Sequence, residues 1–159
     1  MHDLAQLHNI EFLQGLSEHH LEKLALLGEV KQYDSGKILF RENDIHPFFH
    51  VVIEGLVALD IWQPRRAPKR ILTIGPGEIL AWSAVLAGGQ MTTSATTLSS
   101  TQLFTWPAEK FQALCQSDHE IGFVVMQRIA RAVSRRLTAT RLQLLDMLAE
   151  TEPVLRAGP

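Results

Sequence analysis

The sequence predicts an α+β fold that is mainly β: an antiparallel β-roll, or jelly-roll barrel, accompanied by helices. Two observations carry this prediction. Short segments rich in β-branched and aromatic residues follow one another between about residues 30 and 106, with glycine turns between them. From about residue 107 onward, apolar residues recur at helical spacing instead. We expect a single domain over residues 1–151, made of this roll and the helices at about 107–151, and a frayed tail at 152–159.

The composition limits the classes of function. With 159 residues, 46% of them hydrophobic, the chain can form a core without disulfide support. Its net charge of -2 provides no overall attraction to nucleic acid or to an anionic membrane. The single cysteine, Cys115, cannot form an internal disulfide, and no apolar run approaches the roughly 18 residues of a membrane span. Since the first residues also lack signal-peptide features, we expect a cytoplasmic protein with no membrane partner.

A short helix is predicted near the N-terminus. Ser17 is a suitable N-cap, and Leu21, Leu24 and Leu27 then fall on one face. Gly28 stands where such a helix would end. Strand-like sequence follows, with a turn at residues 34–36.

Two helices are predicted after the roll. Pro107 suits a first helical turn, and Ser117 and Glu120 have the spacing of a capping box that would begin a long helix. This helix runs to about Glu150 and carries an apolar seam, formed by Met126, Ala130, Val133, Leu137, Thr140, Leu144 and Met147. Because a small roll cannot cover a stripe of this length, we expect the helix to form the interface of a homodimer.

The order of these elements resembles that of cyclic-nucleotide-binding domains. Four segments resemble successive landmarks of that family: "YDSGKILFREND", "FFHVVIEGLVAL", "ILTIGPGEILAWS" and "LSSTQLFTWPAEKF". They are most similar to the sensor half of the catabolite-activator and FNR-type (Crp/Fnr-like) bacterial regulators, over roughly residues 10–150. The resemblance implies a regulatory module in signal transduction, and not an enzyme.

The segment "GEILAWSAVLAGGQMTTSATT" would correspond to the family's phosphate-binding cassette. We expect a short helix just after Gly77 and Glu78, whose backbone N–H groups would favour an anion, while the Glu78 carboxylate would accept a hydrogen bond from a sugar hydroxyl. Trp82 would either stack on a ligand ring or pack into the core. The candidate ligand-binding residues are Gly77, Glu78, Ile79, Leu80, Ala81, Trp82, Ser83, Met91, Thr92, Thr93, Ser94 and Thr140.

The cassette departs from the family pattern in its charge. Relatives that bind cyclic nucleotides have an arginine that pairs with the cyclic phosphate, whereas Met91 stands at that position here. No arginine or lysine lies between Glu78 and Lys110. Losing one charge-assisted hydrogen bond weakens binding by roughly 10- to 150-fold. Thr92, Thr93 and Ser94 could replace part of it as neutral donors, so we expect weak or altered cyclic nucleotide binding, or another small anionic ligand.

The long helix leaves two interpretations open. Thr140 matches the threonine that reads the adenine edge in the catabolite activator, or it only sets the register of the seam. The basic residues Arg128, Arg131, Arg135, Arg136 and Arg141 are typical of a solvated helix face. The relatives continue into a DNA-binding helix-turn-helix domain, for which the nine residues from 151 to 159 are too few, so we expect no direct nucleic-acid binding.

Enzyme and metal functions find no support in the sequence. The seven histidines show no ligand spacing supported by carboxylates or cysteine, and no catalytic motif is present. The favoured hypothesis is therefore a ligand-sensing module. The alternatives are a dimeric interaction or scaffold protein with a vacant pocket and a protein partner, and the truncated sensor half of a Crp/Fnr-type transcription regulator.

Overall fold

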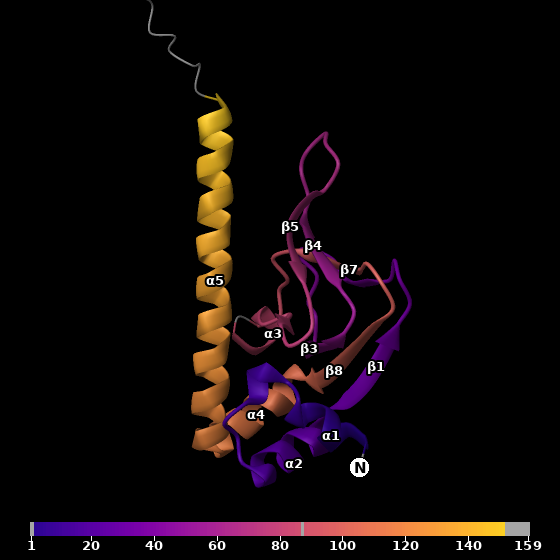
Figure 1. The fold of residues 1–159 in the computed structure, drawn as a ribbon, viewed down its shortest axis with the longest axis vertical. Helices are drawn as coiled ribbons and strands as arrows, with labels where there is room; N and C mark the ends of the chain where they lie inside the picture. Colours follow the sequence, from indigo (N-terminus) through magenta and orange to yellow (C-terminus); the bar gives the residue numbers. More distant parts are fainter. Residues whose placement is uncertain (1, 87, 152–159) are drawn as a thin grey trace, which may run out of the picture.

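The protein folds as a β-roll flanked by helices, with one long helix alongside it (Figure 1). The computed structural model describes residues 2–86 and 88–151. The predicted tail at 152–159 lies outside the described residues. The helices are α1 (His2–His8), the 3-10 helix η1 (Glu11–Leu13), α2 (Glu18–Leu27), α3 (Ser83–Leu86), α4 (Ala108–Ser117) and α5 (His119–Thr151).

The roll consists of two four-stranded sheets in which every pair of neighbours is antiparallel. One sheet has the strand order β1-β8-β3-β6 and the other has the order β2-β7-β4-β5. The strands are β1 (Glu29–Tyr33), β2 (Ile38–Phe40), β3 (Phe48–Glu54), β4 (Val57–Ile61), β5 (Lys69–Ile74), β6 (Ile79–Leu80), β7 (Ser94–Thr97) and β8 (Thr101–Pro107). This confirms the predicted α+β, mainly antiparallel class; the roll is open, not a closed barrel.

Alternation along β3 and β8 divides the core in two, because successive side chains of a strand point to opposite faces. Phe49 and Trp106 pair across the two strands and pack beneath the helices. On the opposite face, Val52 and Leu103 fill the interior of the roll. The Trp106 indole N–H donates to the backbone carbonyl of Leu24 in α2 at 2.8 Å, so the buried ring also ties the helices to the sheet.

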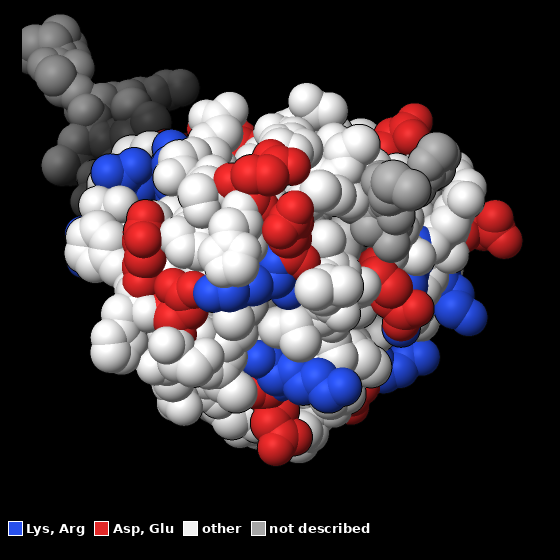
Figure 2. Space-filling view, turned by 90° about the horizontal axis from the view of Figure 1, so that it is seen from below, with Lys and Arg blue, Asp and Glu red and all other residues white. Residues whose placement is uncertain are grey.

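The N-terminal helix follows its sequence signals. The Ser17 side chain accepts a hydrogen bond from the backbone N–H of His20 at 3.3 Å, and α2 ends at Gly28, as predicted. The lower face of the molecule around α1, α2 and α4 carries acidic and basic side chains interspersed among uncharged ones (Figure 2).

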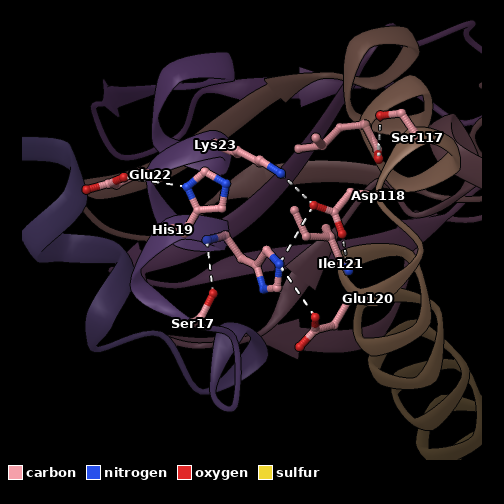
Figure 3. Close-up of polar contacts among 10 residues, drawn as sticks. Ser17, His19, Glu22, Lys23, Ser117, Asp118, Glu120 and Ile121 are labelled. Carbon is pink, nitrogen blue, oxygen red and sulfur yellow. Dashed lines mark hydrogen bonds and ion pairs between the residues drawn. The ribbon is translucent and has the colours of Figure 1, made fainter.

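The junction between α4 and α5 differs from the prediction. Ser117 is the last residue of α4, and its hydroxyl donates to the carbonyl of Leu114 at 3.1 Å. The carboxylate of Asp118 instead accepts from the N–H of Ile121 at 3.3 Å, so the predicted capping box is wrong by one residue (Figure 3). Lys23 of α2 explains the difference, because its ammonium donates to Asp118 at 2.7 Å and stabilises a negative charge at the cap.

Asp118 thus joins α2 to the start of α5. The hydrogen bond from Lys23 and that from the N–H of Ile121 lower the pKa of the Asp118 carboxyl. Gly122 lets α5 approach α4, since a Cβ at this position would overlap the carbonyl oxygen of Cys115.

The long helix changes character along its length. Near its beginning, Ile121, Val125 and Ile129 are buried in the core. Of the predicted seam, Met126 and Val133 are half-buried, and the others are exposed: Ala130, Leu137, Thr140, Leu144 and Met147. In the part of the chain that the structure describes, the seam in the second half of α5 is therefore largely exposed, and Lys69 of β5 contacts the sulfur of Met147 near its end.

Candidate ligand-binding site

The cassette begins in the turn between β5 and β6. Gly77 has a φ of 82°, in the left-handed region that glycine adopts without strain. Its N–H donates to the carbonyl of Val52 in β3 at 2.8 Å, and the N–H of Val52 donates to the carbonyl of Glu78 at 2.9 Å. These two bonds hold the turn on the edge of β3 and leave the Glu78 side chain exposed.

The segment after Glu78 is a strand where a helix was expected. Ile79 and Leu80 form β6, and α3 begins only at Ser83, so the prediction of helical N–H groups next to Glu78 is wrong. The reason is the apolar content of this stretch. Ile79, Leu80 and Ala81 are buried, which favours pairing with β3 over a solvated helix start. Ala81 takes a φ of 59° at the bend into α3, a conformation uncommon for a residue other than glycine.

Trp82 and Ser83 face the protein interior. Trp82 is half-buried and packs against the core cluster that contains Ile79 and Val85, which agrees with the core alternative for this side chain. Ser83 is buried, and its backbone carbonyl accepts from the N–H of Gly89 at 3.0 Å, which closes the loop that follows α3.

The residues at the far end of the cassette have different environments. Met91 is 2% exposed and packs in the apolar interior of the roll with Leu80. Thr92 is exposed and Thr93 half-buried. The Ser94 hydroxyl accepts from the N–H of Glu42 at 2.9 Å. An arginine at Met91 would therefore place its charge in the core, whereas Thr92 and Thr93 have room for a polar contact.

A pocket of about 270 Å³ lies between the cassette turn and α5. Its lining includes three of the predicted ligand residues, Gly77, Glu78 and Ile79, and none of the others. The full lining is Glu11, Phe12, Leu72, Ile74, Pro76, Gly77, Glu78, Ile79, Arg128, Arg131, Ala132, Arg135, Arg136 and Ala139. Thr140 is exposed outside it, and its hydroxyl donates to the carbonyl of Arg136 at 2.9 Å.

Four arginines of α5 line this pocket: Arg128, Arg131, Arg135 and Arg136. Read alone, they are typical of a solvated helix face, but their spacing of three and four residues also places them on one side of α5. This spacing is the only feature of the sequence that indicates that the arginines lie together. It does not indicate that this side of the helix faces Glu78.

Arg136 joins the long helix to the cassette. Its guanidinium donates to the backbone carbonyl of Ile79, the residue after Glu78. Burial lowers the pKa of Arg136, and the nearby charge of Glu78 acts in the opposite direction. The Glu78 carboxylate also accepts from the N–H of Gly75 at 2.8 Å through Oε2. The cassette turn and α5 thus form one polar cluster.

Arg128 closes the other end of the pocket. Its Nη2 donates to the carbonyl of Gln14 at 3.0 Å, while its Nε is buried and has no hydrogen-bond partner among the described residues. On the outer part of α5, the amide of Gln143 donates to the carbonyl of Ile71 at 3.2 Å. These contacts hold α5 along the edge of the roll.

A second polar group lies inside the roll. The Nε2 atoms of His46 and His50 share a hydrogen bond of 2.8 Å, and Nδ1 of His50 is 2.8 Å from the Thr105 hydroxyl. Burial, together with the charges of His46 and Lys31, lowers the pKa of His50 to about 3. Burial also lowers the pKa of His46. His50 is thus held neutral at physiological pH, with its ring nitrogens occupied by structural contacts.

The comparisons with known proteins agree with this fold. A sequence model of the cyclic nucleotide-binding domain matches residues 30–118, more than half of the chain. The chain belongs to the cyclic nucleotide-binding domain family. The matched part includes the cassette and stops before α5, so all four pocket arginines lie outside it.

Solved structures share the fold. The Thermus thermophilus catabolite activator protein is 24% identical, with a TM-score of 0.71 over 87% of this chain and 62% of its own. The N-terminal domain of a transcriptional regulator from Streptomyces coelicolor is 22% identical, with a TM-score of 0.66 over 97% and 99%. The regulatory domain of Toxoplasma gondii PKA, solved with cAMP, is 14% identical, with a TM-score of 0.69 over 82% and 49%.

No curated protein matches the sequence. Within residues 2–86 and 88–151, none of the helices combines the length and apolar character needed to cross a lipid bilayer.

Proposed function

We propose that this cyclic nucleotide-binding domain is a ligand-sensing regulatory module, not an enzyme, whose small anionic ligand binds between the cassette turn and α5. One observation carries the proposal. Arg136 of α5 donates to the carbonyl of Ile79, beside the Glu78 carboxylate, in a pocket of about 270 Å³. A cassette without its own cation thereby gains cationic groups from the long helix.

The residues suggest how the ligand would be held. Because Oε2 of Glu78 already accepts from Gly75, its Oε1 is the oxygen that would accept from a ligand hydroxyl. The guanidiniums of α5 would bind the anionic group. The hydroxyls of Thr92, Thr93 and Ser94 do not line this pocket, so they are candidates only for a ligand that binds further along the cassette. Cyclic nucleotides would bind weakly or in an altered pose, since the cassette supplies no charge-assisted bond of its own.

The signal would leave the domain through α5. A ligand that contacts both the turn and the helix stabilises one position of α5, and it can shift the equilibrium only by its preference for that position. We propose that α5 pairs with its copy in a cytoplasmic homodimer through the exposed seam that includes Leu137 and Leu144. Movement of the helix would then change the dimer surface that a partner, or an attached transcription-regulator domain, reads.

Thermal unfolding with cyclic AMP, cyclic GMP and a panel of phosphorylated metabolites tests the proposal, because a ligand that binds the native state raises the unfolding temperature. We expect a rise with at least one anionic compound, and a smaller rise in Arg136→Gln than in Arg141→Gln, which changes an arginine outside the pocket. The alternative function, a dimeric scaffold with a vacant pocket, predicts no shift with any compound.

A gain-of-binding variant tests the cassette side separately. Thr93→Arg would place a guanidinium at a half-buried position beside Ser94, and Thr92→Arg tests the neighbouring register. If the cassette still holds a cyclic phosphate, one of them should bind cyclic AMP roughly tenfold or more tightly than the parent protein. Equal affinity in both variants and the parent would contradict a cassette that retains this geometry.

A further inference from the structure

We infer that the pocket between α5 and the β5–β6 turn selects a ligand with at least two negative charges, a phosphate monoester of a sugar or nucleoside, over a cyclic phosphodiester. This inference rests on the proposed function and names its ligand class. Four arginines and two glutamates line the pocket, which gives an excess of two positive charges. A cyclic phosphodiester carries one negative charge, whereas a phosphate monoester carries about two near neutral pH.

The four guanidiniums have different tasks. Arg128 and Arg136 are anchored, because each donates to a backbone carbonyl, of Gln14 and of Ile79 respectively. Arg131 and Arg135 lie between them on α5, are exposed, and make no hydrogen bond or ion pair with the other described residues. Two cations are therefore available at the pocket without breaking any contact of the fold.

The arrangement costs stability when the pocket is empty. Arg131 and Arg135 are four residues apart on one helix. Their two guanidiniums are therefore neighbours with like charge. A dianion between them removes this repulsion and can accept paired N–H bonds from each planar guanidinium. A monoanion would leave one positive charge uncompensated.

The carboxylates orient the ligand. Glu78 and Glu11 belong to the turn and to η1, across the pocket from α5. They repel an anionic group and favour a hydroxyl, so the phosphate would face Arg131 and Arg135 while a sugar hydroxyl would face Glu78. This polarity is why we infer a phosphate ester of a hydroxyl-bearing molecule and not a dicarboxylate, which has an anionic group at both ends.

Isothermal titration calorimetry with matched ligand pairs tests the inference: adenosine 5′-monophosphate against cyclic AMP, and guanosine 5′-monophosphate against cyclic GMP. Each pair differs in whether the phosphate is closed into a ring. Glucose 6-phosphate and 2-oxoglutarate serve as the base-free monoester and the dicarboxylate. We expect at least one monoester to bind roughly tenfold or more tightly than its cyclic or dicarboxylate counterpart.

Paired variants assign the charges. Arg131→Ala with Arg135→Ala should weaken monoester binding roughly a hundredfold and reduce its dependence on salt, because two charge-assisted contacts are lost. Arg66→Ala with Arg141→Ala removes the same charge from exposed positions outside the pocket and should change affinity less than threefold. Circular dichroism and thermal unfolding verify that both proteins fold.

The outcomes separate the two proposals. If cyclic nucleotides bind more tightly than every monoester, the inference is wrong and the proposed sensing function stands. If the dicarboxylate binds best, the phosphate class is wrong. If none of these compounds binds, both the inference and ligand sensing at this pocket are contradicted.

Discussion

At the base of the molecule, the first turns of α5 lie beside α4 and the N-terminal helices (Figure 1), and Ile121, Val125 and Ile129 are buried in the core there. Further along the same helix, side chains line a cationic pocket or are exposed. The base is dense: the ring centroid of Phe111 lies 4.9 Å from that of Phe49 and 5.3 Å from that of Trp106. Charges on the lower face are of mixed sign (Figure 2). In the pocket, four arginines gather against two glutamates.

The base serves the stability of the fold, whereas the pocket and the seam are suited to recognition. At the base, the indole of Trp106 and the carboxylate of Asp118 both have partners within the chain. Among the described residues, Oε1 of Gln6 and Nδ1 of His20 are buried there without a hydrogen-bond partner. The pocket and the seam leave charge and apolar surface unsatisfied, which is the condition for binding something else. A helix buried at its first turns and largely exposed in its second half can pass a change at the pocket to the seam without unfolding the base.

The largest effect is expected at the base. Phe111→Ala should lower the free energy of unfolding by about 3–5 kcal/mol, because a fully buried ring is removed and its cavity cannot collapse completely. Phe123→Ala, nearby on α5 but 68% exposed, should lower it by less than about 1 kcal/mol. Urea unfolding measures both, and equal losses would contradict the division between base and surface.

The second largest effect is expected at the seam of α5. Leu137→Glu should raise the dissociation constant of the homodimer roughly a hundredfold, because it removes apolar burial from both copies and adds like charges across the interface. Leu142→Glu is the matched control, since it is 58% exposed against 51% for Leu137 but lies off the seam. Sedimentation equilibrium measures the dissociation constants. A monomeric parent protein, or equal weakening by both variants, would contradict pairing through the seam.

Acidification should lower the free energy of unfolding through His50 inside the roll. Because the pKa of His50 is lowered to about 3, the folded protein excludes a proton that the unfolded chain binds below about pH 6.5. The free energy of unfolding should therefore fall as the pH drops from 6.5 towards 5, by up to about 1.4 kcal/mol per pH unit for this group. His50→Gln should flatten the slope more than His19→Gln, which changes an exposed histidine. The same slope in His50→Gln and the parent would contradict a buried, neutral His50.

The smallest effect is expected at the helix junction. Asp118→Asn should lower the unfolding temperature at pH 7, because the cap of α5 loses its charge towards Lys23 (Figure 3). Since the pKa of Asp118 is lowered in the fold, its contribution is present above the ordinary carboxyl pKa and is lost as the pH falls below it. The difference between variant and parent should shrink on acidification. Glu120→Gln, at an exposed carboxylate, is the control.

Most of the fold could be predicted because it depends on local pattern. Alternation, glycine turns and helical spacing identified the roll and the long helix, and Ser17 and Gly28 marked the bounds of α2. The cap at Asp118 was missed because its partner Lys23 is distant in the sequence. The segment after Glu78 was wrongly predicted as a helix, because burial of Ile79 and Leu80 overrides the local helix signal and favours a strand.

The site could be predicted only on its cassette side. Glu78 was identified because its segment resembles the family's phosphate-binding cassette, and it lies in the pocket lining. The opposing side depends on how α5 is oriented against the roll, and packing of Ile121, Val125 and Ile129 sets that orientation. A sequence pattern shows that Arg131 and Arg135 share a face, but not what that face meets.

We propose that α5, and not the cassette, supplies the cations for the ligand. A crystal structure of the protein bound to adenosine 5′-monophosphate would locate the phosphate. We expect its oxygens within hydrogen-bond distance of Arg131 and Arg135, with a ribose hydroxyl at Glu78. A phosphate held at Thr92 and Thr93 on the cassette side, away from all four arginines, would contradict it.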